Sequence, residues 1–158
     1  YAASFKSIMR ARKLGCATSL WLDPIENRTI EELSLMNFFA VIDGKLHTPE
    51  LKDSFLPGLT RRSVMVLAAH HGIETVEVPI DVNVLLKQIE AGDCTEAFST
   101  GTAAVVSPVR SFKEADGTEI VISDEVGPVA TKLREHLVGI QEGTHEDMFG
   151  WMQPVATE

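Results

Sequence analysis

The sequence has few of the groups that usually mark metal or redox sites. Its only cysteines are Cys16 and Cys94, and neither belongs to a CxxC pair. We therefore expect both to be reduced, buried thiols in a cytoplasmic protein. The pattern HExxH is missing, and the adjacent His70 and His71 diverge on a helix, while the other three histidines are scattered. The sequence thus predicts no metal site.

Basic charge and long apolar runs are also missing. Lysine and arginine number 14 against 23 acidic residues, so the formal net charge is −9. This balance argues against binding nucleic acid through its phosphates. The apolar runs are too short to span a bilayer, and no secretory signal is visible at the start. We expect neither a nucleic acid nor a membrane as partner.

What is present is a chain of 158 residues that is 44% hydrophobic, enough for one domain over residues 1–158. Helices are predicted at residues 5–14, 59–71, 82–91 and 128–140, between glycine and proline signals. Strands are predicted at residues 17–23, 34–43, 45–49, 73–80, 94–99, 103–112 and 118–123, with a hairpin at Asp43-Gly44. Strict βαβ alternation and a GxGxxG motif are missing. The predicted fold is therefore α/β or α+β, with a mixed, mostly antiparallel sheet.

Two loops are candidates for binding an anion. In "LPGLTRRS", residues 56–63, Gly58 precedes a helix that starts at about Leu59, and free amides at a helix start attract anions. In "AFSTGTAAVVSP", residues 97–108, hydroxyls flank Gly101, and the amides near Thr102 and Ala103 can form a nest. An ordinary Pro-Gly turn and a polar connection between strands are the alternatives, and the residues alone do not separate them.

The acidic pair Glu31 and Glu32 is a further candidate. In an extended segment the two side chains point to opposite faces, so one of them points inward. A buried carboxylate needs a cationic or hydrogen-bonding partner. The alternative is that both carboxylates are solvated.

Five stretches, taken in order, resemble one family. They are "EELSLMNFFAVIDGKLHTP", "LPGLTRRSV", "EAFSTGTAAVVSPV", "GPVATKLREHL" and "GWMQPV". Their sequence and spacing resemble the C-terminal half of branched-chain amino-acid aminotransferases, which are fold-type IV enzymes dependent on pyridoxal 5'-phosphate. The resemblance implies the large domain of that fold, with mixed, mostly antiparallel sheets or a pseudo-barrel flanked by helices.

The resemblance also implies a role for each candidate residue. Glu32 corresponds to the carboxylate that pairs with the pyridine nitrogen, and Tyr1 to the tyrosine on the ring hydroxyl. Leu59, Thr60 and Thr102 correspond to the groups that hold the phosphate. The amides of Thr102 and Ala103 would receive the substrate carboxylate. Leu35 and Met36 would lie near the substrate pocket.

Three features depart from the family pattern. Tyr1 matches the last residue of the family's Lys-x-Gly-Gly-Asn-Tyr motif, so the Schiff-base lysine is expected just upstream, and no residue of this chain matches a catalytic one. The small N-terminal domain is missing as well. We expect this chain, which has no initiating Met, to be inactive alone and part of a longer protein. The redox CxxC of some animal relatives is replaced by Ala104 and Ser107.

The implied function of the intact enzyme is transamination between leucine, isoleucine or valine and 2-oxoglutarate in two half-reactions. A homodimer and amino-acid and 2-oxo-acid substrates follow from the same resemblance. The alternatives are a D-amino-acid aminotransferase, an aminodeoxychorismate lyase, or an inactive fragment that binds a partner or only the cofactor.

Overall fold

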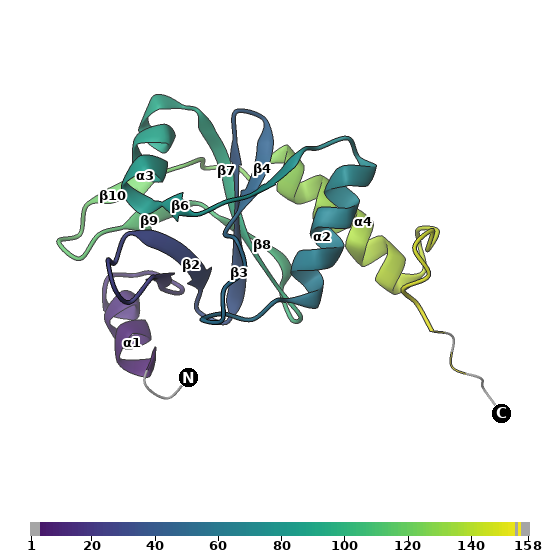
Figure 1. Cartoon of the computed structure of the whole chain (residues 1–158), viewed down its shortest axis with the longest axis horizontal. Helices are drawn as coiled ribbons and strands as arrows, with labels where there is room; N and C mark the ends of the chain where they lie inside the picture. The colour runs from purple at the N-terminus through teal and green to yellow at the C-terminus, as the bar shows by residue number, and fades with distance from the viewer. Residues whose placement is uncertain (1–3, 154, 156–158) are drawn as a thin grey trace.

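A computed structural model describes residues 4–153 and residue 155 (Figure 1). The helices are α1 (Phe5–Lys13), α2 (Leu59–His70), α3 (Val82–Ala91) and α4 (Pro128–Glu142). The strands are β1 (Leu20–Leu22), β2 (Thr29–Leu33), β3 (Met36–Ile42), β4 (Lys45–Thr48), β5 (Thr75–Glu77), β6 (Ile80–Asp81), β7 (Cys94–Gly101), β8 (Val105–Val109), β9 (Ser111–Lys113) and β10 (Glu119–Val121). No helix in this part of the chain has both the length and the apolar character needed to cross a membrane.

One sheet of eight strands organises the molecule. Its central strand β3 pairs antiparallel with β2, β4 and β7. The pair β4–β5 is parallel, whereas β8 and β6 add antiparallel to β7 and β2. Strands β9 and β10 form a separate antiparallel pair. The predicted mixed, mostly antiparallel α/β fold is confirmed.

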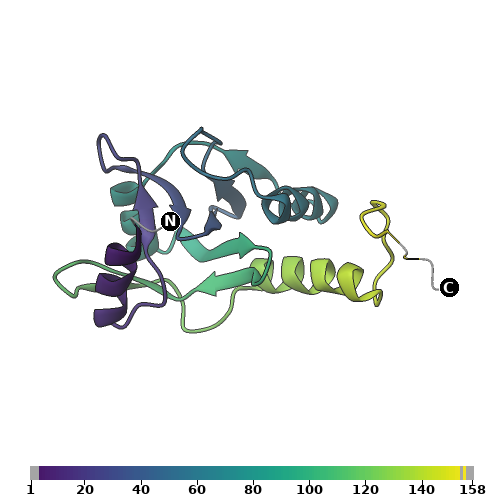
Figure 2. The ribbon, with the colours of Figure 1, turned by 90° about the horizontal axis from the view of Figure 1, so that it is seen from below.

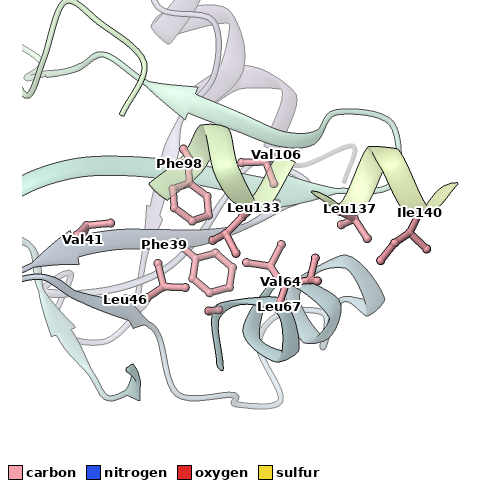
Figure 3. Close-up of a cluster of buried hydrophobic side chains, with 12 residues drawn as sticks. Phe39, Val41, Leu46, Val64, Leu67, Phe98, Val106, Leu133, Leu137 and Ile140 are labelled. Carbon is pink, nitrogen blue, oxygen red and sulfur yellow. The ribbon is translucent and has the colours of Figure 1, made fainter. Parts of the chain in front are cut away.

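Two hydrophobic cores cover opposite faces of this sheet because successive side chains of β3 point to opposite sides. Phe39 belongs to the core beneath α2 and α4 (Figure 3), where its ring stacks on Phe98 with centroids 5.2 Å apart. Phe38 belongs to the other core, which includes Leu85 and Ile89 of α3. Figure 2 shows α2 and α4 side by side, well separated from α1 and α3. One face of the sheet is thus shared between α2 and α4.

Most local signals of the sequence give the expected elements. At the hairpin between β3 and β4, Asp43 and Gly44 have φ of 50° and 73°, as the primed turn requires. The Asp81 side chain accepts hydrogen bonds from the amides of Asn83 and Val84, at 2.8 and 3.2 Å, and so caps α3. Gly92, with φ of 83°, ends this helix in the left-handed conformation.

Two strand predictions were wrong in extent. Residues 73–80 do not form one strand: β5 pairs with β4, whereas β6 pairs with β2. Pro79 lies between them, and a proline has no amide to donate to a ladder. Residues 103–112 also form two strands, because β8 pairs with β7 and β9 pairs with β10. In each segment the paired neighbour strand changes partway along, although the alternation of apolar and polar residues indicates one continuous strand.

Candidate functional site

The predicted loops and Glu32 meet at one end of the sheet. The start of β3, the turn between β7 and β8, and the start of α2 lie along the lower edge of the molecule in Figure 1. In the strand register, Asn37 of β3 is paired with Glu32 of β2 on one side and Thr100 of β7 on the other. Directly paired residues project from the same face of a sheet. Glu32, Asn37 and Thr100 therefore share one face, the one covered by α2 and α4.

Glu32 is a half-buried carboxylate. Burial raises its pKa, because the charged form is poorly solvated, and repulsion from Glu31 adds to this. Glu31 itself accepts a hydrogen bond from the Ser54 hydroxyl at 2.8 Å. No hydrogen bond or ion pair from the described residues reaches the Glu32 carboxylate. A cationic or N–H group brought to this face would therefore stabilise it.

The start of α2 has free hydrogen-bond donors. Gly58 is its N-cap and makes no side-chain cap, and no acidic residue lies in the first turn. Leu59 is 80% exposed and Thr60 is half-buried. Within the described chain, no side chain accepts from the first amides of this helix. These amides and the helix dipole form a site suited to an anion.

The turn between β7 and β8 supplies further polar groups. Thr102 and Ala103 are exposed there, and Val105 just after them has φ of 58°, rare for a β-branched residue. Thr100 is only 1% exposed, yet its Oγ1 has no hydrogen-bond partner among the described residues. Buried hydroxyls are normally paired, so this one has capacity for a ligand or an ordered water.

The residues predicted near a substrate lie at the tip between β2 and β3. Leu35 is 60% exposed, with φ of 70° in the tight turn. Met36 packs close to Gly101, because a Cβ at that glycine would be 3.1 Å from Met36 Cγ. Alternation places Met36 on the opposite face of the sheet from Glu32. There it lines a groove of about 920 Å³ with Ser99 and α1.

The structure thus brings Glu32, Thr100 and the start of α2 to one end, with Thr102, Ala103 and Leu35 on adjoining turns. Met36 lies on the other face. Tyr1 lies outside the described residues. Sequence reasoning missed Asn37, the residue in register with both Glu32 and Thr100. The available signal was a lone amide in the apolar run "LMNFFAVI", because a buried amide needs specific partners.

A histidine cluster lies at the far end of α2. His70, His71, His136 and His145 come together although they are dispersed in the sequence. His71 Nε2 and His136 Nδ1 are 2.9 Å apart. Burial and the neighbouring histidines lower the pKa of both residues. In the part of the chain described, no group of three or more histidine, cysteine or acidic residues is placed to hold a metal ion.

Comparison with known proteins gives a consistent result. The family model "Amino-transferase class IV" matches residues 1–112. A probable branched-chain-amino-acid aminotransferase of Staphylococcus aureus (strain N315) is 43% identical over 151 residues, which are 96% of this chain and 42% of that protein. The chain therefore spans less than half the length of this curated relative.

Solved structures agree in fold. The Escherichia coli branched-chain amino acid aminotransferase is 34% identical, with a TM-score of 0.80 over 96% of this chain and 46% of its own. A T.th. branched-chain amino acid aminotransferase with pyridoxamine 5'-phosphate is 33% identical, with a TM-score of 0.80 over 96% and 45%.

Proposed function

Because the chain belongs to the class IV aminotransferases, we propose that it is the cofactor-binding part of a branched-chain-amino-acid aminotransferase. The names of the similar proteins support this substrate class, and the pyridoxamine 5'-phosphate in one similar structure supports pyridoxal 5'-phosphate as cofactor. The intact enzyme would move an amino group between leucine, isoleucine or valine and 2-oxoglutarate. The observation that carries this proposal is that, among the described residues, the Glu32 carboxylate has no partner and the start of α2 has no side-chain cap, both at one end of the sheet.

Glu32 is proposed to accept a hydrogen bond from the protonated pyridine nitrogen. Its unpaired, half-buried carboxylate fits a cationic ring atom, which would return its pKa toward the usual range. When bound, pyridoxal phosphate supplies the aldehyde that accepts the amino group and the ring that withdraws electrons from the substrate. Tyr1 is proposed to donate to the ring hydroxyl.

The start of α2 is proposed to hold the phosphate. The amides of Leu59 and Thr60 and the hydroxyl of Thr102 would donate to its oxygens. The uncapped first turn and the unpartnered Thr100 hydroxyl nearby fit an anionic group at this end of the sheet. The amides of Thr102 and Ala103 would bind the substrate carboxylate, with Leu35 on the adjoining turn, whereas Met36 lies on the opposite face of the sheet.

The remaining parts of the enzyme are proposed to lie in a longer chain. The 42% coverage of the similar Staphylococcus protein supports a longer chain, and the family resemblance implies that its further parts are an N-terminal domain and an upstream lysine that attaches the cofactor. A homodimer follows from the family resemblance. Cys16 and Cys94 are free thiols, which supports a cytoplasmic location.

Replacing Glu32 by Ala in the intact enzyme tests the proposal directly. We expect turnover to fall by about 100-fold or more, the cost typical of losing a preorganised electrostatic group. Glu31→Ala is the matched control, because that neighbouring carboxylate is already hydrogen-bonded to Ser54. Steady-state kinetics with leucine and 2-oxoglutarate measure the turnover of both variants. Near-normal turnover in Glu32→Ala would show that the ring contact is wrongly assigned.

A substrate panel separates the branched-chain reaction from the related ones. The intact enzyme should transaminate leucine, isoleucine and valine in preference to D-alanine, and should not release pyruvate from aminodeoxychorismate. Borohydride reduction with pyridoxal phosphate should label a lysine upstream of Tyr1. Specific labelling of a lysine within residues 1–158 would contradict the proposed position of that lysine.

A further inference from the structure

Asn37 is a polar residue in an otherwise apolar part of β3. It is 5% exposed, between the partly buried Met36 and the fully buried Phe38. Its side-chain Nδ2 donates a hydrogen bond of 2.8 Å to the carbonyl oxygen of Leu56, 19 residues away. Burying an amide is unfavourable unless its hydrogen bonds are made, so this contact holds a defined geometry.

The other side-chain atom of Asn37 contacts the same turn. A Cβ atom at Gly58 would overlap Asn37 Oδ1. Gly58 has φ of −64° and ψ of 139°, a backbone conformation open to any residue. The glycine is therefore needed here for close approach rather than for an unusual φ. Both polar atoms of Asn37 thus pack on the turn that leads into α2.

The contact between Asn37 and the turn before α2 matters because of where Asn37 lies in the sheet. Asn37 is in register with Glu32 on β2 and with Thr100 on β7. Asn37 therefore connects two parts of the proposed site: its backbone pairs with the strand that carries Glu32, and its side chain holds the turn that precedes the proposed phosphate site. Asn37 Nδ2 donates to the Leu56 carbonyl, and among the described residues no amide of the first turn of α2 donates to a side chain.

We infer that Asn37 is a positioning residue that sets the start of α2 at a fixed place relative to Glu32. The inference rests on the proposed function, because it takes these two elements to bind opposite ends of one cofactor. The proposed function assigns Asn37 no contact with either end of the cofactor. Its loss would leave Glu32 on its strand but release the Leu56–Gly58 turn, and the phosphate contribution to binding would fall selectively.

The test compares pyridoxal phosphate with pyridoxal, which lacks the phosphate, as ligands of the intact apoenzyme. For Asn37→Ala we expect the Kd for pyridoxal phosphate to rise about tenfold, the factor that corresponds to one hydrogen bond. The Kd for pyridoxal should change by no more than about twofold. Absorbance titration measures both constants without relying on turnover.

Thr48→Val is the matched control. The Thr48 hydroxyl makes a buried side-chain hydrogen bond of the same length, 2.8 Å, to the carbonyl of Phe38, but does not touch the turn before α2. This variant should lower the melting temperature and leave the ratio of the two dissociation constants unchanged. An equal loss for both ligands in Asn37→Ala, or no loss for pyridoxal phosphate, would overturn the inference.

Gly58→Ala approaches the same contact from the other side. Its added methyl group must displace Asn37, so the Kd for pyridoxal phosphate should rise here too. In the double variant Asn37→Ala with Gly58→Ala the overlapping atom is gone, and affinity should return to that of Asn37→Ala alone. Additive losses would contradict the inference. If Asn37→Ala does not fold, Asn37→Ser provides the same comparison.

The wild-type enzyme separates failure of this inference from failure of the proposed function. If it does not bind pyridoxal phosphate at all, the proposed function is wrong. If it binds the cofactor and Glu32→Ala weakens both ligands while Asn37→Ala is without selective effect, the function stands and the positioning role is wrong.

Discussion

Helices α2 and α4 begin in the same way but differ in what faces their first amides. Both have a glycine N-cap, Gly58 and Gly127, which offers no side chain. At α4, the buried carboxylate of Glu96 accepts hydrogen bonds from the amides of Val129 and Ala130, both at 2.9 Å. At α2, the described residues offer no such acceptor.

The difference separates a structural helix start from one available to a ligand. The α4 amides are satisfied inside the protein, and a Cβ at Gly127 would overlap the Glu96 carboxyl group. The first α2 amides have no side-chain acceptor in the part of the chain that the structure describes, while Asn37 holds the preceding turn through the carbonyl of Leu56. At α4 the carboxylate of Glu96 accepts from the first amides, whereas at α2 Asn37 holds the preceding turn and no described side chain caps the helix.

The largest expected effect comes from removing the internal anion at α4. Glu96→Ala leaves buried amides without an acceptor at a helix start, so the free energy of unfolding should fall by about 2–4 kcal/mol. Urea denaturation of the apoenzyme followed by circular dichroism measures this. Glu90→Ala, an exposed change on α3, is the control. A loss for Glu96→Ala no greater than for the control would mean that the two helix starts do not differ as described.

A smaller effect should follow from adding an anion at α2. Leu59→Glu puts a carboxylate in the first turn at an exposed position, which should stabilise the apoenzyme by about 0.5 kcal/mol. The same charge repels a phosphate, so the Kd for pyridoxal phosphate should rise about tenfold. Leu59→Gln controls for side-chain size and lacks the charge. Equal affinities for the two variants would argue against an anion site at α2.

The smallest effect concerns the opposite end of α2. The lowered pKa values of His71 and His136 mean that the folded state binds protons less readily than the unfolded state. The neutral cluster is therefore stable above the ordinary histidine pKa of 6.5, and stability falls as the pH drops below it. His70, His145 and Lys132 add unfavourable charge nearby.

Replacing His71 and His136 together by Gln should flatten this pH dependence. Melting temperatures of the apoenzyme between about pH 8 and about pH 5, the range in which histidines titrate, provide the measurement. A residual slope is expected from His47, whose pKa is also lowered by burial. An unchanged slope in the double variant would show that the cluster does not destabilise the folded state on protonation.

Much of the fold was predictable because the signals are local. Gly92, with φ of 83°, and Pro128, in the first turn of α4, mark helix ends through their own backbone preferences. The turn at Asp43-Gly44 follows from the same kind of preference. The division of residues 73–80 was not predictable, because alternation indicates a strand but not which neighbour it pairs with.

The residues of the candidate site likewise fall into those that the sequence predicted and those that it did not. Motif order identified Glu32, the start of α2 and the turn at Thr102, and local geometry predicted the helix start at Leu59. Asn37 and Thr100 could be assigned to the site only from the strand register, which pairs residues far apart in the chain. The histidine cluster depended likewise on the packing of α2 against α4.

By itself the sequence determined the fold class, most helix ends and the family resemblance, since hydrophobic periodicity and the preferences of glycine and proline act over a few residues. Only the tertiary structure decided which polar groups are satisfied and which are left free. Glu96 reaches α4 across 33 residues and Asn37 reaches the turn before α2 across 19. A hydrogen bond over such a separation depends on the folding of everything between its partners. For that reason only the tertiary structure decides that the first amides of α4 have a side-chain acceptor and that those of α2 have none among the described residues.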